Sequence, residues 1–106
     1  MRGKLDEAMD NYRTAIEVKP DYASAYINMG ISWDVKGEFD KAIEQFQKAI
    51  KFQRENAKAY LALGNTLYNK KNLPQAILHY KTAIRLKPDY LEAKNNLKLA
   101  LQPTNN

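Results

Sequence analysis

One apolar pattern occurs three times in this sequence at a constant interval, and it constrains the fold more than any other feature. Within each copy the apolar residues follow the first one at steps of 3, 4, 7, 10 and 11 positions. This spacing places them on one face of an α-helix with 3.6 residues per turn. The three copies are Leu5, Ala8, Met9, Tyr12, Ala15 and Ile16; Phe39, Ala42, Ile43, Phe46, Ala49 and Ile50; and Leu73, Ala76, Ile77, Tyr80, Ala83 and Ile84. A fixed period without insertions predicts a helical repeat protein.

The segments between these copies carry a second apolar face with the same period. It consists of Tyr26, Met29, Gly30 and Trp33 in one unit and of Tyr60, Leu63, Gly64 and Leu67 in the next. Each unit therefore contains two amphipathic helices joined by a short turn, here called helix A and helix B. Gly inside a helix costs about 1 kcal/mol relative to Ala. We therefore expect Gly30 and Gly64 to allow a close approach to helix B, where Ala42 and Ala76 are the matching small residues.

The arrangement of these residues resembles that of the tetratricopeptide repeat family. The similarity rests on Tyr60, Leu63, Gly64 and Leu67, followed by Ala76, Tyr80 and Pro88, and on the equivalent positions from Tyr26 to Phe46. The resemblance implies an all-α superhelix of stacked antiparallel helix pairs, with the A helices lining a concave face. It also implies a non-catalytic scaffold that binds a protein or peptide segment.

The repeat register places the whole chain, residues 1–106, in a single domain. We expect a lone helix B within residues 4–22, full repeats over 23–56 and 57–90, a capping helix over 91–101 and a disordered tail over 102–106. Pro20 and Pro88 should end two of the B helices, because proline removes a backbone donor. Asp21 is predicted to cap the next helix, and Asp89 with Glu92 is predicted to form a capping box.

The two ends of the predicted array differ in polarity. In the last helix Lys94 and Lys98 stand where Tyr60 and Gly64 stand one unit earlier, which gives the polar outer face that a terminal repeat needs. The first helix lacks a partner helix A but keeps an apolar face, so either the chain is a piece of a longer repeat array or another chain covers this face. Self-association there would use Leu5, Met9, Tyr12 and Ile16. A symmetric homodimer is therefore an alternative function. Head-to-tail stacking is disfavoured because both lysines would enter the joint.

Several classes of site are excluded by the composition. The chain has no cysteine, so disulfides and thiolate metal sites are impossible. Metal-ligand spacing and glycine-rich phosphate loops are absent, so no metal and no cofactor are expected. The single histidine, His79, lies off the apolar face without a nucleophile or orienting partner, so no catalytic residue is predicted. No apolar run reaches the roughly 18 residues of a membrane span, and residues 1–20 do not resemble a signal peptide. We expect a cytoplasmic protein without membrane insertion.

The remaining candidate site is the concave surface. The predicted partner-binding residues lie on the faces of the A helices that turn away from helix B: Ile27, Asn28, Ile31, Val35, Leu61, Asn65, Tyr68, Asn69, Asn95 and Asn96. Their aliphatic, aromatic and amide groups suit an extended peptide, because amides both donate and accept hydrogen bonds. Some members of the resembling family grip a C-terminal carboxylate with Lys, Arg and Asn. That mode is disfavoured here, since Ile27, Ile31 and Ala62 occupy the positions concerned.

The net charge of +5 suggests a third function, nucleic-acid binding. Residues 1–56 carry 9 Lys and Arg against 10 Asp and Glu, whereas residues 57–106 carry 8 against 2. The lysines available for phosphate contacts are Lys58, Lys70, Lys71, Lys94 and Lys98. Stacking aromatic residues are scarce among the groove positions, and basic patches alone are weak evidence. Nucleic-acid binding is therefore disfavoured, and a solvated lysine-rich surface explains the charge.

Overall fold

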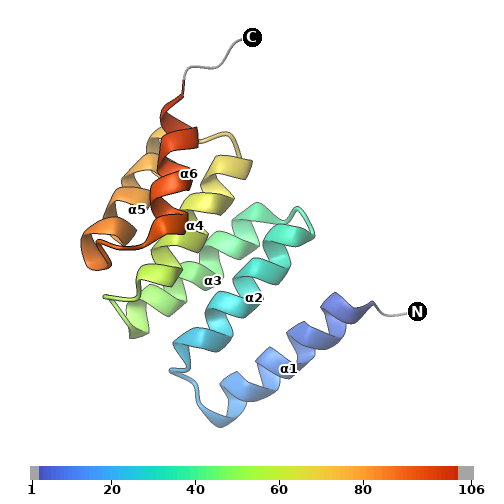
Figure 1. Cartoon of the computed structure of the whole chain (residues 1–106). Helices are drawn as coiled ribbons and strands as arrows, with labels where there is room; N and C mark the ends of the chain where they lie inside the picture. Colours follow the sequence, from blue (N-terminus) through green and yellow to red (C-terminus); the bar gives the residue numbers. More distant parts are fainter. Residues whose placement is uncertain (1–2, 103–106) are drawn as a thin grey trace.

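The structure is a computed structural model that describes residues 3–102, and within that range it contains α-helices and no strand. The helices are α1 (Lys4–Val18), α2 (Ala23–Val35), α3 (Phe39–Phe52), α4 (Ala57–Asn69), α5 (Leu73–Leu86) and α6 (Leu91–Leu101). They follow one another as antiparallel neighbours joined by short turns (Figure 1). The prediction of an all-α helical repeat is confirmed. Most of the tail predicted to be disordered, residues 103–106, lies outside the described residues.

The helices form two layers with different spacing. Every helix packs against its neighbour in the chain, and α2 also contacts α4, as α4 contacts α6. No such second-neighbour contact links the B-type helices α1, α3 and α5 within the described range. The A-type helices are therefore closer together than the B-type helices, so the stack curves with α2, α4 and α6 on its inner side. This curvature creates the concave face.

Each glycine at a helix crossing is fitted against one aromatic ring. A Cβ added at Gly30 would stand 2.7 Å from Cδ1 of Phe46, and a Cβ added at Gly64 would stand 2.7 Å from Cδ1 of Tyr80. Phe46 and Tyr80 occupy the same position in consecutive repeats, and both are buried. The predicted close approach of helix A to helix B is thus confirmed in both units. It fixes the depth at which the aromatic rings lie beneath the concave face.

The turns from A-type to B-type helices require a left-handed residue at one fixed position. Gly37 has φ of 80° there, and Lys71, at the equivalent position of the next repeat, has φ of 70°. The left-handed region is readily accessible to Gly, whereas an L-residue with a side chain costs roughly 1–2 kcal/mol there. The two turns therefore share one backbone shape, although only one of them has the residue best suited to it.

The predicted helix caps at Asp21 and Asp89 are wrong. The N-cap residues of α2 and α6 are Tyr22 and Tyr90, and neither makes a side-chain cap hydrogen bond, so Glu92 completes no capping box. The N-cap residue of α4, at the equivalent position, is Asn56, whose side chain accepts a hydrogen bond from the Ala59 backbone N–H at 3.1 Å. The repeat register, rather than the local preference for Asp, decides where these helices begin.

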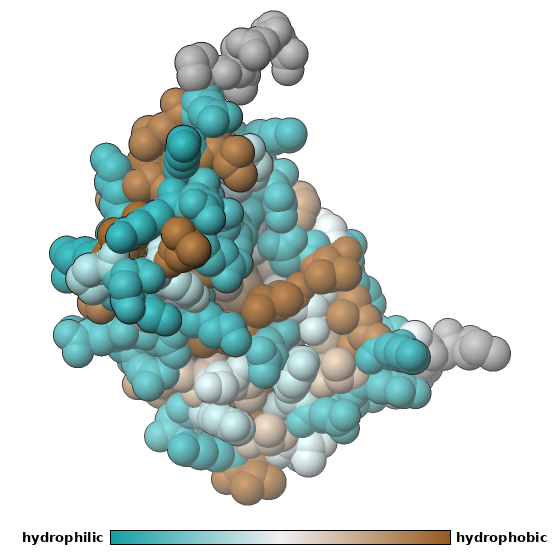
Figure 2. Space-filling model, in the orientation of Figure 1, coloured by the Kyte–Doolittle hydropathy of each residue, from teal (hydrophilic) through white to brown (hydrophobic). Residues whose placement is uncertain are grey.

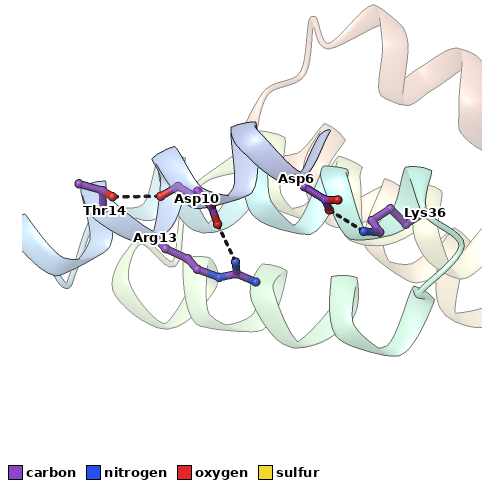
Figure 3. Close-up of polar contacts among 5 residues, drawn as sticks. All are labelled: Asp6, Asp10, Arg13, Thr14 and Lys36. Atoms are coloured by element: carbon purple, nitrogen blue, oxygen red, sulfur yellow. Dashed lines mark hydrogen bonds and ion pairs between the residues drawn. The ribbon is translucent and has the colours of Figure 1, made fainter. Parts of the chain in front are cut away.

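Ion pairs across consecutive repeats obey the same register. The Lys36 ammonium lies 2.7 Å from Asp6, and the Lys70 ammonium lies 2.5 Å from Asp40, which is the same contact one unit later. Figure 3 shows Lys36, at the end of α2, reaching Asp6 on α1, while Asp10 pairs with Arg13 at 3.1 Å. All these side chains are well exposed, so each pair contributes at most about 1 kcal/mol. They nevertheless direct both lysines toward the preceding B-type helix.

The two ends of the array are covered to different degrees. Ala8, Tyr12 and Ala15 on α1 are only half-buried, whereas their equivalents on α3 and α5 are all buried. Of the predicted self-association residues, Leu5, Tyr12 and Ile16 are also half-buried, but Met9 is 2% exposed. Met9 is therefore a core residue, because α2 packs over this part of α1. The prediction that Met9 lies on an open face is wrong.

Candidate functional site

A groove of about 500 Å³ lies on the concave face. In Figure 2 the surface is hollowed between α6 and α2, and apolar and hydrophilic side chains meet along the hollow. Sites that hold small ligands or peptide side chains commonly have volumes of about 300–1,000 Å³. The lining residues, here called the groove, are Ile31, Asp34, Phe46, Lys58, Leu61, Ala62, Asn65, Tyr68, Asn69, Tyr80, Tyr90, Glu92, Asn96 and Leu99.

Three side chains from three helices form a hydrogen-bonded chain across the groove floor. The Tyr80 hydroxyl on α5 donates to Oδ1 of Asn65 on α4 at 2.7 Å, and Nδ2 of Asn96 on α6 donates to the same oxygen at 2.9 Å. This network assigns the orientation of both amides. Within residues 3–102, Nδ2 of Asn65 and Oδ1 of Asn96 then have no partner. The groove thus presents one free amide donor beside one free amide acceptor.

A second polar cluster joins α2 to α4 at one end of the groove. The Asp34 carboxylate accepts a hydrogen bond from the Thr66 hydroxyl and another from Nδ2 of Asn69 at 3.0 Å. Thr66 is fully buried, so its hydroxyl holds one carboxylate oxygen in place. Both donors are neutral, and they orient the carboxylate without cancelling its charge.

The electrostatics of the floor keep Tyr80 protonated. Burial, with smaller contributions from the neighbouring Tyr68 and Asp34, raises the pKa of Tyr80 to about 12, because a phenolate there would be poorly solvated and repelled. The Tyr80 hydroxyl is therefore a neutral donor at any physiological pH. It fixes the Asn65 amide instead of taking part in acid–base chemistry.

Apolar side chains stand above this polar floor. Ile31 and Tyr68 are 39% and 38% exposed, and Leu99 is more exposed still. Leu61 and Ala62 are buried beneath them and close the floor. A segment lying in the groove would therefore contact aliphatic and aromatic groups along its sides and amides below.

Comparison with known proteins assigns the family. A TPR-repeat model matches residues 2–32 and 36–71, and a tetratricopeptide-repeat model matches residues 57–90. The chain belongs to the tetratricopeptide repeat (TPR) family. Members of this family are typically non-catalytic protein-interaction modules. A comparison with curated proteins finds no match.

Solved TPR structures share this fold over nearly the whole chain. The first TPR of Spaghetti (RPAP3), bound to the HSP90 peptide SRMEEVD, has a TM-score of 0.86 and 26% identity, with 92% of this chain and 78% of that chain covered. The first TPR domain of the human RPAP3 protein has a TM-score of 0.88 and 26% identity, covering 92% and 77%. The Arabidopsis OM64 TPR domain, at 24% identity, has a TM-score of 0.86 over 92% and 81%.

The TPR groove brings together part of the predicted binding set and excludes the rest. The residues that line it are Ile31, Leu61, Asn65, Tyr68, Asn69 and Asn96, and those that do not are Ile27, Asn28, Val35 and Asn95. Ile27 is buried in the core, because α2 and α4 contact each other. Val35 is exposed at the end of α2. The groove is centred on α4, so α2 contributes only its later turns and α6 only the side that meets α4.

The charged residues of the groove are absent from the predicted set. Lys58 and Glu92 share one position in consecutive repeats, and Asp34 lies one helical turn beyond Ile31. Helical spacing alone could have placed them on the groove, since residues three or four apart share a face. Phe46 and Tyr80 belong to the repeated apolar faces of the B helices, and they also reach the floor.

His79 lies outside the groove. It is half-buried and stacked on Tyr60, with 6.1 Å between the ring centroids. Burial lowers the pKa of this imidazole, because it disfavours the charged form. Among residues 3–102, no group of three or more His, Asp or Glu could hold a metal ion. No helix in this range is long and apolar enough to cross a membrane.

Proposed function

We propose that this TPR domain is a non-catalytic scaffold that binds an extended protein segment in its groove. The observation that carries the proposal is the free donor of Asn65 beside the free acceptor of Asn96, each held by the Tyr80–Asn65–Asn96 hydrogen bonds. An extended backbone presents a C=O and an N–H that such a pair can satisfy. The related Spaghetti domain, solved with a peptide, supports a peptide as the class of ligand.

The apolar groups beside the amides would contact the side chains of the bound segment. Ile31, Tyr68 and Leu99 leave apolar surface exposed around the amides. In peptide recognition, main-chain hydrogen bonds give affinity while pockets for side chains give specificity. The amides are fixed before the ligand arrives, so little ordering entropy is lost at this point on binding.

The proposal is tested with a random peptide library, panned on the immobilised domain, and fluorescence polarisation of the peptides recovered. Asn96→Ala removes the free acceptor, while Asn65 keeps its bond from Tyr80. We expect roughly a tenfold loss of affinity, which corresponds to one hydrogen bond of about 1.4 kcal/mol. Asn95→Ala, an exposed neighbour outside the groove, is the matched control and should bind as the unchanged domain does. Peptides that bind equally well after Asn96→Ala and after Ile31→Lys would refute the proposal.

Self-association is a second candidate function, favoured by the incomplete burial of Ala8, Tyr12 and Ala15. Head-to-tail stacking in the repeat register would place Lys98 against Tyr12, at the crossing where Gly64 meets Tyr80 with no room for a Cβ. A symmetric homodimer through α1 avoids that collision. Sedimentation at high micromolar concentration should show a dimer that Tyr12→Glu dissociates, and a strict monomer would eliminate this candidate.

The groove does not gather the lysines that were considered for nucleic-acid binding. Lys70 is paired with Asp40, and Lys58 is the only cation that lines the groove in the described range. Binding dominated by phosphate contacts would weaken steeply with salt, and we expect no such binding in a filter assay at low salt.

The cytoplasmic location stays a prediction from the sequence, and microscopy of a tagged chain would test it.

A further inference from the structure

We propose that the groove selects segments carrying a Lys or Arg side chain, whose positive charge lies against Asp34. The inference rests on the proposed function, because it names the chemistry of the segment that the same groove binds. It differs from an acidic-tail specificity, and it follows from how charge is distributed around the groove.

The groove has the opposite charge to the chain as a whole. The full sequence has a net charge of +5. Among the described residues, the groove contains two carboxylates, Asp34 and Glu92, and one ammonium, that of Lys58. A concave site whose lining carries an excess of one sign of charge attracts ligands of the other sign. The excess of acid in the groove of a basic protein therefore favours a basic segment.

Asp34 is oriented but not neutralised. Its carboxylate accepts hydrogen bonds from Thr66 and Asn69, which are both uncharged. No ion pair to Asp34 is formed by any cation in the described range. A carboxylate can accept about four hydrogen bonds in all, so it retains capacity for an ammonium or guanidinium group. Bonds of that charge-assisted kind are stronger than neutral ones.

Two lysines close to this cluster are directed elsewhere: Lys36 is two residues after Asp34, and Lys70 directly follows Asn69. Lys36 and Lys70 are the C-cap residues of α2 and α4, and their ammonium groups pair with Asp6 and Asp40 on α1 and α3. The last turns of α2 and α4 contain no basic residue. The negative ends of both helix dipoles thus add to the charge of Asp34. This end of the groove is electrostatically prepared for a cation.

A carboxylate-rich ligand would be repelled by the same groove. Among the described groove residues it would find a single ammonium, that of Lys58 in the first turn of α4, and it would lie against the fixed charges of Asp34 and Glu92. Like charges brought together at an interface act against the wrong partner. The same groove residues that attract a basic segment therefore reject an acidic one.

The test uses three fluorescein-labelled pools of nine-residue peptides that differ only at the central position, which is Lys, Glu or norleucine. The flanking positions are randomised among uncharged residues. We expect the Lys pool to bind roughly tenfold more tightly than the norleucine pool, as one charge-assisted hydrogen bond would give, and the Glu pool to bind least. Fluorescence polarisation at fixed ionic strength measures all three.

The decisive variant is Asp34→Asn, which removes the charge and keeps one oxygen, so that one of the two hydrogen bonds from Thr66 and Asn69 can still form. It should abolish the preference for Lys while leaving the affinity for the norleucine pool unchanged. Asp21→Asn is the matched control, because it changes the net charge equally at an exposed residue outside the groove. It should preserve the preference. Circular dichroism establishes that both variants remain helical.

The outcomes separate this inference from the proposed function. A Lys preference that survives Asp34→Asn, or a Glu pool that binds as well as the Lys pool, overturns the inference alone, provided that norleucine binding still depends on Asn96. If no pool binds, or if binding is indifferent to Asn96→Ala, the proposed function fails and the inference fails with it.

Discussion

The fit of Gly64 against Tyr80 allows one substitution to be worked through in detail. In Gly64→Ala the new methyl group would stand 2.7 Å from both Cδ1 and Cε1 of the Tyr80 ring and 3.3 Å from the Ala76 carbonyl oxygen. Carbon atoms that are not bonded do not approach so closely unless something moves. The ring cannot swing aside freely, because Tyr80 is buried and its hydroxyl is bonded to Asn65. The other neighbour is the backbone of α5, which is rigid.

Two opposing effects set the magnitude. Alanine is a better helix former than glycine by about 1 kcal/mol. Overpacking a close-packed core costs about 1–3 kcal/mol, and we place this case at about 3 kcal/mol because a ring and a backbone oxygen are both too close. The free energy of unfolding should therefore fall by about 2 kcal/mol. For a domain of this size, that corresponds to a melting temperature about 10 °C lower.

Urea unfolding followed by circular dichroism measures this change, and a second background tests its cause. In a Tyr80→Leu domain the ring is gone and only the Ala76 carbonyl oxygen stays close, so most of the overpacking cost of Gly64→Ala should disappear while its helix-propensity gain remains. We expect it to stabilise that background by up to about 1 kcal/mol. A Gly64→Ala domain as stable as the original would refute the argument from close approach. An equal loss in both backgrounds would show that the ring is not the cause.

Two further predictions concern the floor and the turns. The pKa of Tyr80 is raised from 10.0 to about 12, so its contribution to stability is complete below pH 10 and is lost as the pH rises toward 12. Tyr80→Phe should remove this part of the alkaline destabilisation and the last tyrosinate absorbance step; an unchanged pH profile would contradict the assignment. At the left-handed turn position, Gly37→Ala should lower the free energy of unfolding by about 1 kcal/mol, whereas Lys71→Gly should leave it equal or higher. Urea unfolding of the two variants measures both changes. A Gly37→Ala domain at least as stable as the original, or a Lys71→Gly domain less stable than the original, would refute this prediction.

The helices and their crossings could be predicted because the information is local and repeated. A face such as that of Ala76, Tyr80 and Ala83 specifies a buried stripe, and its recurrence at a constant interval specifies what lies opposite. Gly30 and Gly64 added a distance constraint, since a glycine within a helix has a cost that close packing offsets. The predicted caps at Asp21 and Asp89 were wrong because the repeat register, and not the local residue preference, decides where these helices begin. Asp21 suits the N-cap position by preference, but the register places the N-cap of α2 one residue later, at Tyr22.

The groove was harder to predict because its depth depends on how far the stack curves. The sequence places Ile27 and Ile31 on similar faces of one helix, yet Ile27 is 2% exposed and Ile31 is 39% exposed. The difference arises where α2 meets α4, a contact between second neighbours that no single helix pattern encodes. Pairings such as Asn65 with Asn96 likewise depend on the rotation between helices two apart in the chain.

The repeat positions at the helix crossings and the repeat positions facing the groove differ in how much their residue types vary. Positions at the helix crossings keep their residue type from unit to unit, as Gly30 and Gly64 do, because the same ring must fit each time. Positions facing the groove change instead: Ile31, Asn65 and Leu99 are equivalent, as are Asp34 and Tyr68, and Lys58 and Glu92. Each unit therefore offers a bound segment a different chemistry at the same geometric place. A segment lying along the groove would contact these groups in a fixed order. The groove would therefore select the chain direction of the segment as well as its composition.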